Sequence, residues 1–147
     1  MNHLPFHTAH HWITQLAQLP HPITINEIAR VATELSWTPT DRSAAFTYGK
    51  PESFLIQVSY NRESEEIFAV TFPLFATKID NIKERVLAAD FYKKYIEQAS
   101  KAWGAPTDHA TSSTATIWRL HDKAYAMIYL RPKKIIASFE RHDPNDL

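Results

Sequence analysis

The sequence predicts a single α+β domain in which a long helix separates two three-stranded antiparallel meanders, after one or more N-terminal helices. Apolar residues recur every three or four positions in "PITINEIARVATELSW" and again over 81–103, as in amphipathic helices. They alternate with polar residues in six shorter segments, as in half-buried strands. No run rich in Pro, Gly and Ser divides the 147 residues. We therefore expect one domain over 1–147, with a helical segment over 1–22 and a polar tail over 141–147.

The N-terminal part predicts two helices. Thr8 is placed to cap a helix that continues to about Gln18, and Pro20 ends it. Thr24 and Glu27 have the spacing of a capping box, in which each side chain satisfies a free backbone amide at the start of a helix. The apolar stripe that follows this box predicts the buried face of the second helix; it consists of Ile28, Val31, Ala32 and Leu35.

Alternation with a period of two predicts the first meander over 43–48, 53–60 and 67–72. In the third strand, Phe68, Val70 and Phe72 are expected to share one face. Pro73 is expected to end that strand, because proline has no amide to donate to a neighbour. The connections "GKPE" and "NRESEE" are short, which favours antiparallel pairing.

The second half predicts a long helix and a second meander. Asn81 and Glu84 form another capping box, and the apolar stripe continues to Trp103. Gly104 follows the stripe and Pro106 prevents continuation, so "WGAP" is typical of a helix end. Three strands are expected over 114–120, 123–130 and 134–140.

Composition excludes several classes of function. The chain has no cysteine, which removes disulfides, thiolate metal sites and cysteine nucleophiles. It has only two glycines, far apart, so a glycine-rich phosphate-binding loop is excluded and no cofactor is expected. Sixteen basic residues balance sixteen acidic ones, which does not favour nucleic-acid binding. No secretory signal and no membrane-spanning run is evident, and we expect a cytoplasmic protein.

Four histidines near the N-terminus are candidate metal ligands: His3, His7, His10 and His11. On a helix, His7 and His11 lie at i and i+4, a spacing that can hold Zn²⁺ or Ni²⁺. No acidic residue before Glu27 completes a ligand set locally. A solvated first helical turn explains the histidines more simply, and no metal site is predicted.

One set of residue types suggests a hydrolase. Asp108 and His109 are followed by Ser112 and Ser113 in a polar loop. A catalytic serine needs a strained turn with a base and an orienting group held in place, and this loop lacks the glycines of such a turn. We expect no enzyme, and a small hydrolase remains the third hypothesis.

Acidic residues gather in the turn of the first meander, at Glu63, Glu65 and Glu66. Solvent exposure is their simplest role. An acidic contact for a basic partner comes second, because such charges steer association. Acid–base catalysis, which requires a buried carboxyl group, comes third.

Both faces of the second meander look partly apolar. Tyr125, Met127 and Tyr129 alternate on one face of its middle strand, and small or aliphatic residues take the other. If the helices cover only one face, this tyrosine row is exposed and suits partner binding, since Tyr and Met are enriched in binding surfaces. The alternative is that a helix or the N-terminal segment covers the row.

Three stretches carry a family resemblance over about 25–140: "LSWTPTDRSAAFTYGKPES", "FYKKYIEQASKAWGAPT" and "ATIWRLHDKAYAMIYL". This layout, with a late helix ending in Gly-x-Pro before a Trp-containing strand, resembles small immunity proteins of bacterial polymorphic toxin systems. The resemblance implies a cytoplasmic protein that binds and blocks a cognate toxin without chemistry of its own.

The element order is also similar to that of type III secretion chaperones, which would imply a homodimer that holds an effector segment. The chain departs from that family in two ways. It lacks an acidic excess, and "ERHDPNDL" is too short and too polar for a final helix. The chaperone is therefore the second hypothesis. Either family implies a protein partner, a cognate toxin or an effector, and neither implies binding to nucleic acid or membrane.

Overall fold

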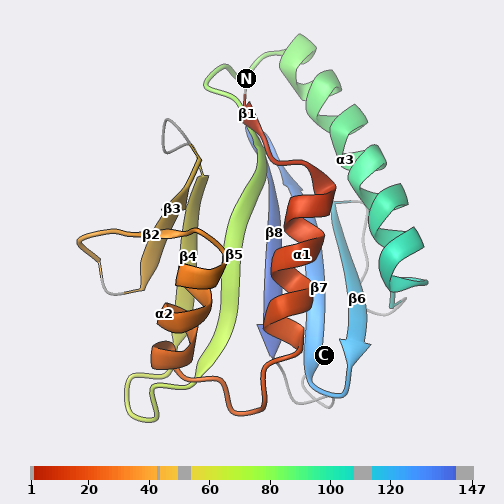
Figure 1. Cartoon of the computed structure of the whole chain (residues 1–147). Coiled ribbons are helices and arrows are strands. Elements are labelled where there is room, and N and C mark those ends of the chain that lie inside the picture. Colours follow the sequence, from red (N-terminus) through yellow and green to blue (C-terminus); the bar gives the residue numbers. More distant parts are fainter. Residues whose placement is uncertain (1, 43, 50–53, 108–113, 142–147) are drawn as a thin grey trace.

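The computed structural model describes residues 2–42, 44–49, 54–107 and 114–141 (Figure 1). Two helices come first and a third lies between two groups of strands, which confirms the predicted α+β class. The helices are α1 (Phe6–Ala17), α2 (Ile25–Glu34) and α3 (Ile82–Trp103). The strands are β1 (Asn2–His3), β2 (Thr38–Pro39), β3 (Ala45–Tyr48), β4 (Phe54–Tyr60), β5 (Ile67–Ala76), β6 (Ala115–His121), β7 (Ala124–Arg131) and β8 (Lys134–Arg141).

The two predicted meanders are halves of one antiparallel sheet. Its strand order is β2-β3-β4-β5-β8-β7-β6, and β1 pairs with β5 outside this path. The halves join where the last strand of each meander pairs, with Val70 of β5 opposite Phe139 of β8 and Phe72 opposite Ala137. The two-residue strands β1 and β2 were not predicted, because two residues are too few to show an alternation of apolar and polar residues.

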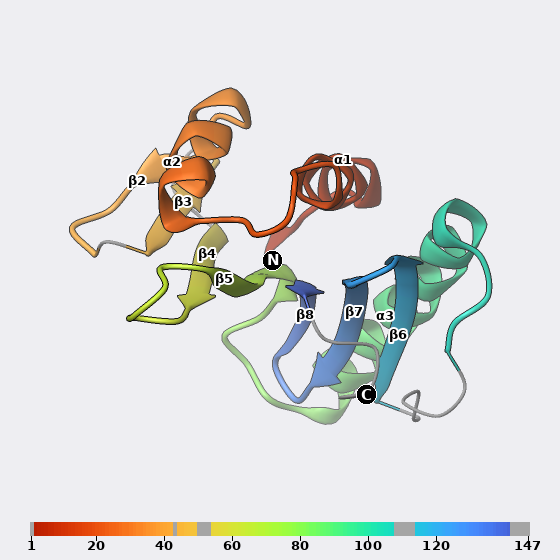
Figure 2. The same cartoon turned by 90° about the horizontal axis from the view of Figure 1, so that it is seen from below.

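All three helices pack on the same face of this sheet (Figures 1 and 2). Trp12 of α1 contacts Phe72 of β5 edge to face, with ring centroids 4.9 Å apart. Trp103 of α3 contacts Trp118 of β6 in the same manner at 5.4 Å. The buried residues of α2 belong to the same hydrophobic core. The opposite face of the sheet carries no helix within the described ranges. Ile117, Tyr125 and Ser138 are buried on this face, so only part of it is accessible.

Side-chain caps begin α2 and α3, as the two capping boxes predicted. Thr24 Oγ1 accepts a hydrogen bond from the amide of Glu27 at 3.4 Å, and Asn81 Oδ1 accepts one from the amide of Glu84 at 2.9 Å. The cap predicted for α1, Thr8, was three residues late. The cap position is Pro5, no side chain caps the helix, and Thr8 lies inside its first turn.

Gly104 ends α3, as the "WGAP" step predicted. Its φ is +89° and its ψ is −160°, a combination that is essentially restricted to glycine. Its amide donates to the carbonyl of Ser100 at 3.0 Å. The chain then turns away from α3 toward β6.

The predictions for β5 were wrong at two positions. Pro73 does not end the strand, because the register against β8 shifts between Pro73 and Phe75 and the strand continues to Ala76. Phe68 does not share the buried face of Val70 and Phe72. A register shift against β4 sets Ile67 opposite Tyr60, so Ile67 is buried and Phe68 is 50% exposed.

The polar tail begins one residue later than expected. Arg141 was assigned to the tail over 141–147, but it is the last residue of β8, pairs with Ala124 and is buried. The strand alternates so that Ile135, Ala137, Phe139 and Arg141 point to the helical side. A charged side chain therefore occupies a core-facing position at the end of the sheet.

Candidate functional site

A row of apolar residues crosses five strands on the helix-free face. Pro73 of β5 lies opposite Ile136 of β8, which lies opposite Tyr129 of β7, which lies opposite Ala115 of β6. Leu55 of β4 extends the row, since it lines a shallow pocket together with Pro73 and Ile136. We call these five residues the apolar row.

The apolar row is partly open to solvent. Leu55 is 42% exposed, and the other four residues are half-buried. At the β7 end, the guanidinium of Arg131 lies 4.6 Å from the ring centroid of Tyr129, a cation–π contact. Burial and the charge of Glu140 raise the pKa of Tyr129, while Arg131 opposes this shift, so the phenol stays neutral.

The structure separates the two tyrosines that were expected to bind a partner. Tyr129 belongs to the apolar row and is accessible. Tyr125 is only 4% exposed and lies opposite Glu140 on β8 and Arg119 on β6. The sequence left open whether this row is exposed or covered: it is buried at Tyr125 and half-buried at Met127 and Tyr129.

The acidic turn between β4 and β5 is an ordered loop whose glutamates do not act as one group. Asn61 Oδ1 accepts hydrogen bonds from the amides of Glu63 and Ser64, at 2.9 and 3.1 Å. Glu63 and Glu65 are exposed, as the simplest interpretation predicted. Glu66 is half-buried and turns toward the loop between α1 and α2, where its Oε1 lies 3.6 Å from Nε2 of His21.

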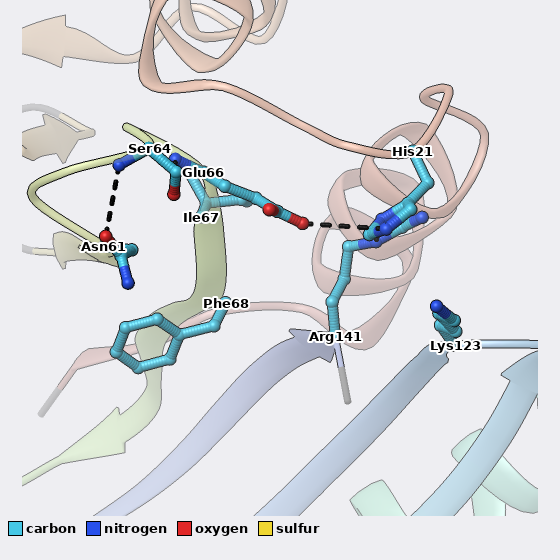
Figure 3. A pocket seen from close by; sticks show the side chains of 8 residues that line it. All are labelled: His21, Asn61, Ser64, Glu66, Ile67, Phe68, Lys123 and Arg141. Atoms are coloured by element: carbon cyan, nitrogen blue, oxygen red, sulfur yellow. Dashed lines mark hydrogen bonds and ion pairs between the residues drawn. The ribbon is translucent and has the colours of Figure 1, made fainter. Parts of the chain in front are cut away.

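Glu66 belongs to a pocket at the lower end of the sheet, with a cavity volume of about 330 Å³ (Figure 3). The other ring nitrogen of His21, Nδ1, accepts a hydrogen bond from Nε of Arg141 at 3.2 Å. A chain of polar contacts thus links the end of β8 to the start of β5 through a histidine. The lining residues are His21, Asn61, Ser64, Glu66, Ile67, Phe68, Lys123 and Arg141.

Arg141 is the least ordinary residue of this pocket. It is 9% exposed, and burial lowers its pKa while the nearby charge of Glu66 opposes that effect. Among the described residues no carboxylate lies within ion-pair distance of its guanidinium, and Nη1 is buried without a hydrogen-bond partner. Buried polar groups in folded proteins nearly always have partners, so this nitrogen is an unmet donor within the described structure, as are the indole nitrogens of Trp37 and Trp118.

Two of the four N-terminal histidines, His3 and His10, contact aromatic side chains of α3. His10 accepts a hydrogen bond at Nδ1 from Trp103 at 3.0 Å, and the ring of His3 lies 5.3 Å from that of Phe91. His7 and His11 are exposed. Nowhere in the described part of the chain do three or more His, Asp or Glu side chains gather as a metal site would require.

The four residues of the hydrolase hypothesis, Asp108, His109, Ser112 and Ser113, lie outside the described residues. The sequence reasoning missed His21, Lys123 and Arg141. A signal for Arg141 was present, since the alternation of Ile135, Ala137 and Phe139 places residue 141 on the buried face. His21 and Lys123 come from loops distant in sequence, and no local pattern connects them.

No helix in the parts of the chain that the structure describes is long and apolar enough to cross a membrane. Neither a curated protein nor a solved structure matches the chain. A family model described as a family of unknown function, DUF6301, matches residues 7–139, which extend from α1 into β8. The chain therefore belongs to the DUF6301 family.

Proposed function

We propose that this protein is an immunity-type protein, which binds a cognate bacterial toxin and blocks it without chemistry of its own. The observation that supports this best is the apolar row on the helix-free face of the sheet. It offers a continuous strip from Leu55 to Ala115 that no helix within the described ranges covers.

A surface of this kind suits a protein partner. Antiparallel sheets often expose one face to water, and the side chains on that exposed face are then mostly polar. Here Leu55, Ile136 and Tyr129 occupy it instead, and burying such side chains against a partner releases free energy in proportion to apolar area. Tyr129 also offers a hydroxyl group beside the charge of Arg131, which adds direction to the contact.

Two further features support an inhibitor. Glu63 and Glu65 project from the turn between β4 and β5, where they can attract a toxin with a basic substrate groove. The layout resemblance to immunity proteins extends over about 25–140, which includes both faces of the sheet. Inhibitors of this type work by shape and by a few buried anchors, and they require no catalytic group.

Co-expression tests the proposal. The product of the neighbouring gene is expressed in a bacterial host, alone and together with this protein, and growth is measured alongside co-purification. The neighbour should arrest growth alone, and this protein should restore growth and co-purify with it. A harmless neighbour, or a toxic one that this protein neither binds nor counteracts, would refute the assignment.

The same preparation distinguishes a secretion chaperone from an immunity protein. A chaperone of the resembled type is a homodimer that holds an unfolded segment of its partner. Light scattering on the purified protein gives its mass, and an activity assay of the complex shows whether the folded partner is blocked. An immunity-type protein inhibits a folded, active partner, whereas a chaperone binds the isolated segment and leaves the activity intact.

A further inference from the structure

The pocket below the sheet lies apart from the apolar row and is not needed for the proposed function. It is formed where three loops meet the end of β8: the loop from α1 to α2, the turn from β4 to β5 and the turn from β6 to β7 (Figure 3). Arg141 is the most buried of its charged lining residues. The question is which ligand would complete the contacts of that guanidinium.

Among the described residues, two nitrogens of the Arg141 guanidinium can be assessed. Nε donates to His21 Nδ1, which fixes His21 as an acceptor at that nitrogen and leaves Nε2 to carry the proton toward Glu66. Nη1 is buried and unpartnered within the described structure. A buried cation with unused donors gains most from an oxygen anion, which an arginine fork can hold through two nitrogens.

The charge of the lining residues indicates the kind of anion. Arg141 and Lys123 are cationic, Glu66 is anionic, and His21 is neutral when it accepts from Arg141. The pocket therefore carries about one net positive charge. A singly charged carboxylate neutralises that charge, whereas a doubly charged phosphate would leave about one net negative charge in the pocket and would incur a larger desolvation cost.

The remaining wall of the pocket is apolar and accessible. Phe68 turns out of the core because of the register shift in β5, and its ring lies on the opposite side of the pocket from Arg141 and Lys123 (Figure 3). The amide group of Asn61 lies near it, with its oxygen already used by the amides of Glu63 and Ser64. One side of the pocket thus offers cationic donors and the other an aromatic surface.

We propose that this pocket binds a small carboxylate, whose oxygens contact Arg141 and Lys123 and whose apolar part lies against Phe68. The ligand class is a monocarboxylate with a hydrophobic tail short enough for a cavity of about 330 Å³. Binding would close the polar chain from Glu66 through His21 to Arg141 and would fix the three loops relative to β8. It requires no reaction.

The test is an NMR titration of the full chain with acetate, phenylacetate, 4-phenylbutyrate and inorganic phosphate, each against sodium chloride at matched ionic strength. Acetate should shift the amide signals of residues around Lys123 and Arg141 with a dissociation constant on the order of millimolar. One of the two aryl acids should bind up to about tenfold more tightly than acetate, because its ring contacts Phe68. Phosphate should bind more weakly than acetate.

Variants assign the contacts. Lys123→Gln should weaken acetate binding about tenfold by removing a charged donor, and Lys93→Gln, an exposed lysine on α3, should change nothing. Phe68→Ala should remove the advantage of the aryl acids and leave acetate unchanged. Arg141→Gln should abolish acetate binding. If that variant does not fold, the effect of Lys123→Gln on acetate binding still tests the proposal.

The proposal is overturned if chloride reproduces the shifts, if none of the carboxylates shifts the pocket residues, or if phosphate binds more tightly than acetate. Equal weakening of acetate binding by Lys123→Gln and Lys93→Gln would also overturn it, since the effect would then reflect the lower net charge of the protein and not a contact in the pocket. None of these outcomes bears on toxin binding, so the proposed function stands or falls separately.

Discussion

The indole Nε1 of Trp103 donates a hydrogen bond to Nδ1 of His10 over 3.0 Å. This contact joins the last residue of α3 to the middle of α1, across 93 positions of sequence. Phe6 and Trp118 pack around the same indole, with ring centroids 5.4 Å away in each case. The helix end at "WGAP" is therefore an anchor that holds α1 and α3 together on the helical face of the sheet.

Trp103→Phe should lower the free energy of unfolding by about 2 kcal/mol, because it removes the donor to His10 and reduces the packed volume. Urea denaturation measures the change. His10→Ala and the double variant complete a thermodynamic cycle, in which the coupling energy should be about 0.5–1.5 kcal/mol. A coupling near zero would mean that the hydrogen bond contributes nothing beyond packing.

Gly104→Ala should cost about 1–3 kcal/mol of stability, because alanine rarely adopts a φ of +89° with a ψ of −160°. A Cβ at this position meets no atom within 4 Å, so the cost is conformational and not steric. The neighbouring exposed position supplies the control, since Ala105→Gly should change stability far less. Thermal unfolding of both variants makes the comparison, and a neutral Gly104→Ala would contradict the observed helix end.

Stability should fall as the pH rises above about 10, where unfolded tyrosine begins to ionise. Burial raises the pKa of Tyr95 and of Tyr92 above the ordinary value of 10.0, so the folded state holds both phenolic protons more tightly than the unfolded state. Their contribution is complete below that value and is lost as the pH rises toward the folded pKa. Urea denaturation at several pH values measures the slope.

Tyr95→Phe separates the pH effect from the hydrogen bonds of the hydroxyl group, whose oxygen lies 2.7 Å from the carbonyl oxygen of Leu4 and 2.9 Å from that of Leu74. The variant should lose about 1–2 kcal/mol near neutral pH and should show a shallower alkaline slope. An unchanged slope would indicate that Tyr95 is not among the groups responsible for the alkaline loss.

Phe68→Ala and Phe72→Ala test the register of β5 directly. Phe68 is half exposed and should tolerate the change within about 0.5 kcal/mol. Phe72 is fully buried against Trp12 and should cost about 3–5 kcal/mol. Similar losses of stability at both positions would mean that Phe68 and Phe72 share the buried face, which would contradict the register of β5.

Local chemistry explains which elements the sequence predicts well. The caps at Thr24 and Asn81 and the stop at Gly104 each depend on a side chain and a backbone only a few residues away. Such interactions are visible as spacing in the sequence. The helix and strand classes therefore follow from the residues, and the errors at their ends are small.

The errors in β5 and at the site have a different origin. The predictions for Phe68 and Pro73 were wrong because β5 shifts its register against β4 and β8. These shifts depend on strands far away in the chain. The pocket joins His21, Glu66 and Arg141 through the folded topology alone. The apolar row likewise depends on the pairing of β5 with β8, which joins the two meanders and which no local sequence pattern specifies.

The most direct test of the central claim compares two exposed aliphatic residues on opposite sides of the molecule. Leu55→Asp alters the apolar row, and Ile82→Asp alters a residue that begins α3 and is 82% exposed on the helical side. The affinity for the purified neighbouring toxin is measured by calorimetry. The account predicts at least about a tenfold loss for Leu55→Asp and none for Ile82→Asp. Unchanged binding by Leu55→Asp, or a selective loss with Ile82→Asp, would contradict it.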